Sequence, residues 1–304
     1  MPVPSPHPVP FGRAPFVLLL LAALVLGSVT TPPADAAARL PIHARPVRAR
    51  AAAHPGSPAE PITFHGGAVM TGAVHVYVVW YGGWSPRSNR RRIITDFLRN
   101  VASPYWDINR GYPNAAGKVV TSTPELRGQI DDPGSVGTTA LSDTDIQRVV
   151  EAAISSKALP RDSRGIYLVL TSSKVTKTGF LTEYCGWHSY ARMAGTTIKF
   201  AFIGDPTGPR LGGCGATSRT PNGDPGADSM VSTIAHELAE TVTDPTFRGW
   251  RTASGEENAD RCAFRFGTQY LTRRGPANVH LGARDYLLQT NWVNTTNPHC
   301  GLTP

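Results

Sequence analysis

The sequence predicts an α/β (α+β) fold in which a mixed, twisted sheet is backed by helices. Three observations support this class. Short runs rich in β-branched and aromatic residues alternate with stretches whose apolar residues recur at helical spacing. The chain contains 30 glycines and 27 prolines, which predicts many turns. After Pro245 the regular patterns become rare, so the C-terminal part is expected to be rich in loops.

The strands are predicted first, because their apolar runs are the clearest. Ala73–Gly82, Gly165–Ser172 and Thr196–Asp205 are almost continuously apolar, which is typical of strands covered on both faces. Shorter strands are predicted at Lys118–Leu126 and at Tyr286–Val293. Strands and helices therefore alternate along most of the chain.

Three helices are predicted between these strands. The first two, Ser88–Ala102 and Ser142–Pro160, each begin with a serine that can cap the first turn. The third covers residues 229–243, where an apolar residue recurs every four positions from Met230 to Val242. This third helix carries the polar residues discussed below.

The N-terminal 60 residues are expected to lie outside the fold. Residues 1–36 are predicted to be a signal peptide, because Arg13 precedes the apolar run Phe16–Val29 and Ala34-Asp35-Ala36 resembles a signal peptidase site. The run is shorter than the ~20 residues that span a bilayer, and an uncleaved anchor is the alternative. Residues 37–60 are rich in Ala, Pro and Arg, which predicts a disordered linker or pro-segment. Residues 61–304 are predicted to form a single domain, secreted and extracellular, with no membrane association after cleavage.

The charge distribution limits the partners. The formal net charge is +8, but no dense run of Lys and Arg is present, which excludes nucleic-acid binding. A weak attraction to acidic cell-wall polysaccharide is compatible with this charge. We expect a monomer that acts on a peptide or protein.

Four cysteines are present, Cys185, Cys214, Cys262 and Cys300. An even number in a secreted chain implies disulfides. Of the three possible pairings we favour Cys185–Cys214 and Cys262–Cys300, because each joins neighbours in sequence. No C-x-x-C pair exists, which argues against a zinc ribbon.

The stretch "AHELAETVTDP" (Ala235–Pro245) holds a candidate metal site. His236 and Glu240 are four residues apart and share one helix face, so they can chelate one cation. Glu237 is adjacent to the first ligand and can act as the general base for a water molecule. Zinc accepts imidazole and carboxylate together, whereas calcium prefers oxygen ligands only. Zinc is therefore the expected cofactor, and calcium is less favoured.

A third ligand is expected from "GEENADRC" (Gly255–Cys262). Glu257 and Asp260 are three residues apart and would point the same way on a short helix. We favour Glu257 as the ligand with Asp260 behind His236, and the reverse assignment stays open, with Glu256 in reserve. A Cys262–Cys300 bond would anchor this segment.

Other interpretations of these residues are available. The third helix can instead present a solvated acidic face with one satisfied histidine. His188 can lie near the site as a base or substrate contact, or be structural beside a disulfide. Trp80, Tyr81 and Trp84 can form a sugar-stacking platform, or belong to the core.

Four stretches resemble the Exordium family, also called phosphate-induced protein 1, and occur in the same order as in that family. Its members are secreted plant proteins linked to cell expansion and growth signalling. The four stretches are Phe64–Trp84, Ser142–Ser172, Gly179–His188 and Pro221–Pro245. The candidate metal site predicts a secreted metal-dependent hydrolase, and we favour a peptidase. The resemblance to the family implies the alternative, a non-catalytic extracellular or cell-wall protein that acts in growth signalling or carbohydrate binding.

This chain departs from the plant pattern in two respects. Plant members usually carry cysteines near Leu181 and Arg210, and they generally lack the His-Glu pair. In these respects the chain resembles a microbial branch of the family, in which "HELAE" precedes "TDP" and Glu-x-x-Asp-x-Cys follows. That resemblance implies a zincin-like fold with a metal motif made of His236, Glu237, Glu240, Glu257, Asp260 and Cys262.

Overall fold

The computed structural model describes residues 60–121, 123–207 and 211–304. The signal peptide predicted for residues 1–36, and the linker or pro-segment up to residue 59, lie outside the described residues. Within the part that the structure describes, no helix is both long and apolar enough to cross a membrane.

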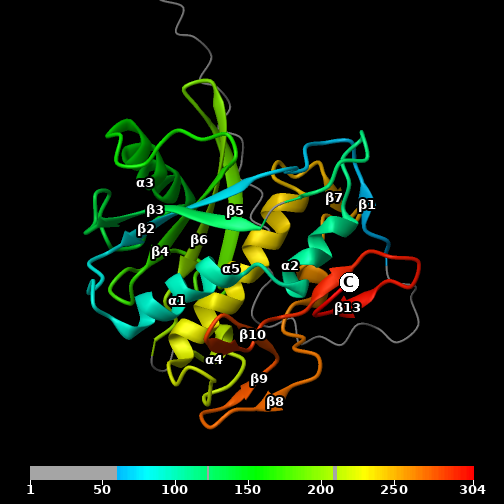
Figure 1. Ribbon diagram of the computed structural model, residues 1–304. Helices are drawn as coiled ribbons and strands as arrows, with labels where there is room; N and C mark the ends of the chain where they lie inside the picture. Colours follow the sequence, from blue (N-terminus) through cyan, green and yellow to red (C-terminus); the bar gives the residue numbers. More distant parts are fainter. Residues whose placement is uncertain (1–59, 122, 208–210) are drawn as a thin grey trace, which may run out of the picture. The chain divides into compact units, whose positions relative to one another are not determined.

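A five-stranded sheet forms the centre of the fold, with strand order β3-β2-β4-β6-β5 (Figure 1). Four strands are parallel, and β5 at one edge runs antiparallel to β6. The mixed sheet expected from the sequence is therefore confirmed. Its strands are β2 (Val74–Tyr81), β3 (Pro124–Asp132), β4 (Gly165–Thr171), β5 (Gly186–Met193) and β6 (Thr196–Gly204).

Helices cover both faces of the sheet. Helices α1 (Asn89–Asn100) and α5 (Pro225–Thr243) pack on one face, and α3 (Asp143–Ser155) packs on the other. Successive residues of β2 point to opposite sides, so Val76 joins the core under α5 and Tyr77 the core under α3. Burial on both sides explains why the central strands are almost continuously apolar.

The predicted helices form where their capping residues indicate. The Ser88 side chain accepts a hydrogen bond from the backbone N–H of Arg91 at 3.1 Å, and Ser142 forms a capping box with Asp145. Helix α5 begins at Pro225, earlier than the predicted residue 229. The Asp224 side chain caps it, and proline suits the first turn of a helix, so the helix already includes Pro225-Gly226 despite their usual preference for turns.

Two strand predictions need correction, and one strand was not predicted. Strand β3 was expected at Lys118–Leu126 but occupies Pro124–Asp132, because its half-buried edge alternates between polar and apolar residues and lacks a continuous apolar run. Strand β5 was not predicted, because its sequence GWHSYARM is mostly buried yet contains Gly, His and Ser, and so shows neither a continuous apolar run nor an alternation. The strand predicted at Tyr286–Val293 divides into β11 (Arg284–Tyr286) and β12 (Asn291–Val293).

The remaining elements are short, as expected for a loop-rich C-terminal part. Two-stranded pairs join β1 to β7, β8 to β9, β10 to β11 and β12 to β13. Both favoured disulfides, Cys185–Cys214 and Cys262–Cys300, are confirmed. The elements not yet placed are β1 (Thr63–Phe64), α2 (Pro104–Asp107), η1 (Ile108–Gly111), α4 (Leu211–Cys214), β7 (Trp250–Arg251), η3 (Asp260–Cys262), β8 (Tyr270–Leu271), β9 (Pro276–Ala277), β10 (Val279–Leu281) and β13 (His299–Gly301).

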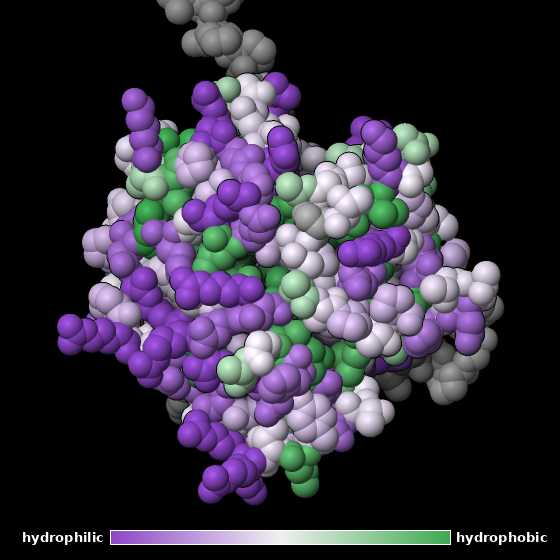
Figure 2. Space-filling model, viewed as in Figure 1, coloured by the Kyte–Doolittle hydropathy of each residue, from purple (hydrophilic) through white to green (hydrophobic). Residues whose placement is uncertain are grey.

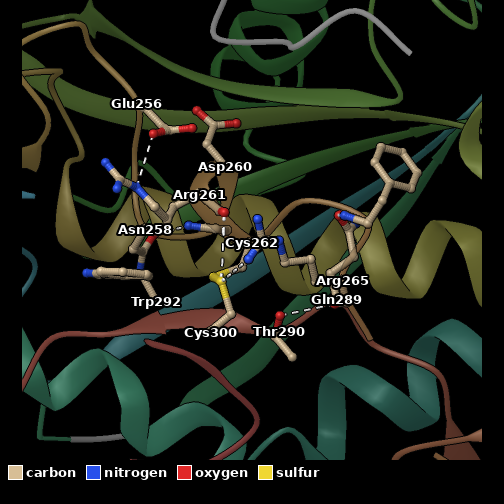
Figure 3. Close-up of a disulfide and its surroundings, with 12 residues drawn as sticks. Glu256, Asn258, Asp260, Arg261, Cys262, Arg265, Gln289, Thr290, Trp292 and Cys300 are labelled. Atoms are coloured by element: carbon tan, nitrogen blue, oxygen red, sulfur yellow. Dashed lines mark hydrogen bonds and ion pairs between the residues drawn. A yellow bond between two sulfur atoms is a disulfide. The ribbon is translucent and has the colours of Figure 1, made fainter. Parts of the chain in front are cut away.

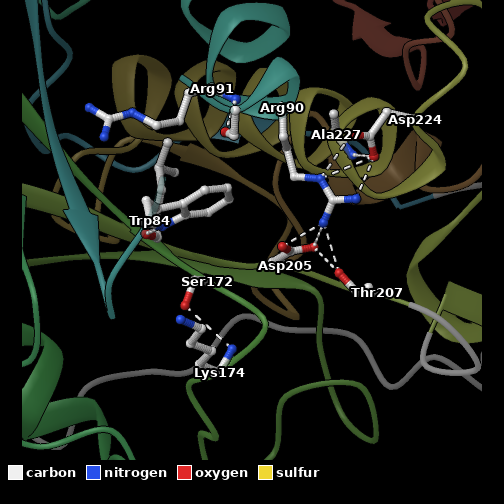
Figure 4. Close-up of polar contacts among 11 residues, drawn as sticks. Trp84, Arg90, Arg91, Ser172, Lys174, Asp205, Thr207, Asp224 and Ala227 are labelled. Carbon is white, nitrogen blue, oxygen red and sulfur yellow. Dashed lines mark hydrogen bonds and ion pairs between the residues drawn. The ribbon is translucent and has the colours of Figure 1, made fainter. Parts of the chain in front are cut away.

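Arg90 in the first turn of α1 fixes the start of α5 (Figure 4). Its guanidinium donates to Asp205, just after β6, and to the capping residue Asp224, with Nε 3.0 Å from Asp224 Oδ1 and Nη1 2.6 Å from Asp205 Oδ2. Nη1 also donates to Thr207 Oγ1 at 2.8 Å. These contacts tie the sheet, α1 and the N-terminus of α5 together.

The aromatic residues considered for sugar stacking do not form an exposed platform. Trp80 and Tyr81 are completely buried, and Trp84 packs edge-on against Trp80 with ring centroids 5.3 Å apart. Their assignment to the core is therefore correct. The face drawn in Figure 2 is mostly hydrophilic, with apolar side chains in small separate areas, as is usual for a protein surface.

Candidate metal centre

The close contact between α5 and β5 creates the candidate site. A Cβ atom at Gly186 would lie 2.6 Å from Thr233 Cγ2 and 3.3 Å from Glu237 Oε1. His188 lies two residues along the same strand and pairs with Ala201, which belongs to the core under α5. Gly186 and His188 therefore share the face of β5 that is turned toward the helix.

One group of side chains forms around His236. Its Nε2 lies 3.0 Å from Glu240 Oε1 and 3.6 Å from Asp260 Oδ1. The backbone N–H of Asp260 donates to Glu240 Oε1 at 2.9 Å. One potential ligand atom from each of the three residues lies within 4.8 Å of the others. We call His236, Glu240 and Asp260 the outer group.

A second group forms around His188. Its Nε2 lies 3.1 Å from Glu257 Oε2 and 3.8 Å from Glu240 Oε2, and the three residues again offer ligand atoms within 4.8 Å of one another. We call His188, Glu240 and Glu257 the inner group. The structure places Asp260 beside His236 and Glu257 beside His188, so Glu257 is not in the group around His236 that the favoured assignment expected. Which of the two carboxylates binds an ion stays a prediction.

His188 is the site residue that the sequence analysis did not identify as a ligand. The useful signal was Gly-x-His in "GWHSYARM", which places a small residue and a potential ligand on one face of a strand. Because β5 was not predicted, the sequence did not indicate that this pattern lies beside the helix.

The segment that supplies Glu257 and Asp260 is held firmly (Figure 3). The Cys262–Cys300 disulfide joins it to β13, and the backbone N–H of Trp292 donates to the carbonyl of Asn258 at 3.0 Å. Glu256, the reserve ligand, pairs instead with Arg261 at 3.1 Å and is in neither group.

The carboxylates are buried, so a solvated acidic helix face is the wrong interpretation. Glu237 is 3% exposed, and both Glu240 and Glu257 are 0% exposed. Glu237 Oε2, Glu240 Oε2 and Glu257 Oε1 have no hydrogen-bond partner among the described residues. A buried polar atom left in this way costs about 1–3 kcal/mol, more if charged. A bound cation would satisfy these oxygens, and the mixed imidazole and carboxylate ligands suit zinc better than calcium.

The site also shifts the proton affinities of its residues. Burial raises the pKa of Glu237 and of Glu257 well above the usual range, and burial with the charge of Asp260 raises the pKa of Glu240 to about 7. Burial would lower the pKa of His236, but Glu240 and Asp260 together outweigh it and raise that pKa well above 6.5. The cluster thus retains protons that a cation would displace.

A small cleft opens onto the outer group. Its volume is about 50 Å³, and its lining includes His236, Glu237, Asp260, Gly186 and Phe264. His188, Glu240 and Glu257 are not among the described residues that line it. The cleft has room for only a few water molecules or a small chemical group.

The conserved region of phosphate-induced protein 1 matches residues 62–275. The chain belongs to the phosphate-induced protein 1, or Exordium, family. This confirms the family indicated by the sequence motifs, and the residues of both groups lie within the matched region.

Several plant proteins are similar over most of the chain. EXORDIUM-like 3 of Arabidopsis thaliana is 28% identical over 276 residues, which cover 78% of this chain and 81% of the relative. EXORDIUM of the same plant is 32% identical over 230 residues, covering 65% and 70%, and PHOSPHATE-INDUCED 1 of Nicotiana tabacum is 29% identical over 217 residues, covering 62% and 66%. No solved structure matches the chain.

Proposed function

We propose that this Exordium-family protein is a zinc-dependent hydrolase that cleaves peptide bonds at the outer group. The observation that carries the proposal is the position of Glu237. It is adjacent to the ligand His236 on α5, it lines the same cleft, and its Oε2 has no hydrogen-bond partner among the described residues. A general base must lie close to the reacting groups, and the place of Glu237 in the cleft lining beside His236 supports that role.

The arrangement of elements supports a zincin-like site of the microbial type. Helix α5 carries the His-Glu pair beneath the sheet, and the edge strand β5 runs antiparallel to its neighbour. In the described residues β5 pairs with β6 alone, which leaves its other edge without a strand partner. Extended peptides commonly bind along such an edge.

Each protein residue then has a defined task. A bound divalent cation supplies Lewis-acid activation of water and of the substrate carbonyl. Glu237 accepts a proton from the attacking water as the new C–O bond forms, and it returns that proton to the leaving amine when the C–N bond breaks. Asp260 holds Glu240 through its backbone N–H and so fixes the carboxylate opposite His236.

An extracellular location belongs to the same proposal. Both disulfides lie close to the site, because Cys185 lines the cleft and Cys262 follows Asp260 by two residues. Disulfides persist mainly in oxidising compartments. A secreted monomer with a peptide or protein substrate agrees with these features.

Substitution of the base tests the proposal. Glu237→Gln should retain zinc, measured by elemental analysis, and lower the rate of peptide cleavage by about 10²–10⁴-fold. The exposed residue Glu183 beside the cleft-lining residue Tyr184 provides the control, since Glu183→Gln should change neither quantity. Full activity in Glu237→Gln would exclude this mechanism.

A second candidate function follows from how closed the site is. Since the cleft holds about 50 Å³, the metal can be purely structural in a non-catalytic extracellular or cell-wall protein for growth signalling or carbohydrate binding. In that case chelation should unfold the protein, no peptide should be cleaved, and binding to insoluble polysaccharide should depend on the folded, metal-loaded state.

A further inference from the structure

Glu240 stands between two sets of ligands. Its Oε1 faces His236 Nε2 at 3.0 Å, and its Oε2 faces His188 Nε2 at 3.8 Å. The side chain is completely buried and comes from the last turn of α5. A carboxylate with its two oxygens directed at different histidines has the geometry of a bridge.

The inner group is built like a ligand site and not like an ordinary ion pair. His188 and Glu257 are 2% and 0% exposed, and Glu257 approaches the histidine through Oε2 alone. Glu257 Oε1 and Glu240 Oε2 lack a hydrogen-bond partner within the described part of the chain. A structural pair this deep would have its remaining oxygens satisfied by donors.

The two histidines define two positions. His188 and His236 each form a compact set with Glu240, but they do not occur together in one set of atoms within 4.8 Å. A single ion held in the observed arrangement therefore contacts one histidine or the other. Two ions are needed for both histidines to act as ligands.

The charge of the cluster also indicates two ions. Glu237, Glu240, Glu257 and Asp260 are four carboxylates in a buried space, with His188 and His236 as the only nitrogen ligands in the two groups. One divalent cation balances half of the charge of the ionised carboxylates, whereas two balance all of it. Buried charge is stable only when it is compensated.

We propose that the inner group binds a second divalent cation, so that Glu240 bridges a dinuclear centre with His236 and Asp260 on the outer ion and His188 and Glu257 on the inner ion. This rests on the proposed metal site of the outer group. Carboxylate-rich sites with two ions about 3.5–4 Å apart occur in aminopeptidases, phosphatases and nucleases. The cleft is lined by the outer residues His236 and Asp260, whereas His188 and Glu257 are not among the described residues that line it.

Metal stoichiometry and metal–metal coupling test the proposal on the full chain. The chelated protein, reloaded with Mn²⁺ and freed of excess ion, should contain two ions per chain. The electron paramagnetic resonance spectrum should show exchange coupling between them, as expected for ions that share a carboxylate. This part uses the native protein and is independent of whether any variant folds.

Variants assign each ion to its residues. Glu257→Gln should reduce the content from two ions to one and remove the coupling, and His236→Gln should also leave one uncoupled ion. Glu240→Gln should lower the content to one or none. The adjacent residue Glu256, which pairs with Arg261, gives the matched control, and Glu256→Gln should retain two coupled ions.

The outcomes separate this proposal from the proposed function. Two coupled ions in a protein that cleaves no peptide would support the centre and exclude the hydrolase. One uncoupled ion, retained in Glu257→Gln and accompanied by cleavage, would overturn the second site and leave the hydrolase standing. No bound ion at all would overturn both.

Discussion

Helix α5 has one polar cluster at its N-terminus and another near its C-terminus, and the two clusters are built differently. At its N-terminus, one guanidinium from Arg90 donates to Asp205 and Asp224, and almost every donor has an acceptor. In the part that faces β5, four carboxylates gather around two histidines, and three of their oxygens lack a hydrogen-bond partner among the described residues. The first cluster is complete, whereas the second would be completed by the cation proposed for it.

This difference is a general guide to buried charge. A cluster that serves the fold pairs its ions and satisfies their lone pairs, because unpaired buried charge destabilises the native state. A cluster that serves a ligand leaves specific atoms unpaired and directed to one point. Removing charge should therefore have opposite effects on stability at the two ends of α5.

The largest effect is expected at the complete cluster. Arg90→Met leaves two buried or half-buried aspartates without their cation, and it should lower the free energy of unfolding by about 3–5 kcal/mol. Denaturant unfolding monitored by circular dichroism measures this loss. The exposed residue Arg99 on the same helix is the control, because Arg99→Met should change stability by less than about 0.5 kcal/mol.

The second cluster depends on a distant segment, and that dependence can be measured separately. Replacing both Cys262 and Cys300 by serine opens a loop that spans a sequence separation of 38 residues. The loss of stability should be about 2–4 kcal/mol in the chelated protein. Metal affinity should fall at least about tenfold, because the anchor of Glu257 and Asp260 is lost. Unchanged metal affinity in this variant would show that the Cys262–Cys300 disulfide does not position the ligands.

Two isosteric substitutions compare the clusters most directly. In chelator, Glu240→Gln removes one negative charge from an unbalanced cluster and should raise the free energy of unfolding by about 1 kcal/mol. Asp205→Asn removes a charge from a balanced cluster and should lower it by about 1.5–3 kcal/mol, the value of a charged hydrogen bond. A loss of stability in both variants would contradict the distinction drawn between them.

The smallest effect concerns Lys199, a buried charge that marks no ligand site. Its ammonium donates to the carbonyl of Ser163, and burial lowers the pKa from 10.5 to about 8. Between these values the unfolded chain binds more protons than the native protein, so stability should rise as the pH increases from 8 to 10.5. We expect a rise of less than about 2 kcal/mol in the chelated protein, and it should be absent in Lys199→Met. A flat profile in the native protein would show that the amine reaches solvent.

The sequence predicted those parts of the fold that depend on local interactions. Ser88 and Ser142 cap helices that form as expected, and the buried strands β2, β4 and β6 occur where apolar runs predicted them. The edge strand β3 was misplaced, because its half-buried residues alternate between polar and apolar and resemble a loop. The edge strand β5 was missed, because Gly, His and Ser interrupt its apolar residues although most of the strand is buried.

The site was predictable to the extent that it lies on one helix. His236, Glu237 and Glu240 are joined by helical geometry alone, so their spacing was sufficient. The positions of Glu257 and Asp260 depend on how a separate segment is anchored, and spacing could not tell which of them faces His236. His188 comes from β5, and its partnership with Glu240 is purely tertiary.

The close contact at Gly186 also bears on how this protein can diversify. Any side chain there would meet Thr233 on α5 and push the helix away from the strand, which would separate His188 from Glu240. Replacement of Gly186 by a residue with a side chain is therefore unfavourable, because Thr233 Cγ2 and the backbone carbonyl oxygen of Phe202 already occupy that space. Since Gly186 and Thr233 both line the cleft, such a replacement would alter the cleft and the spacing of the two groups at the same time.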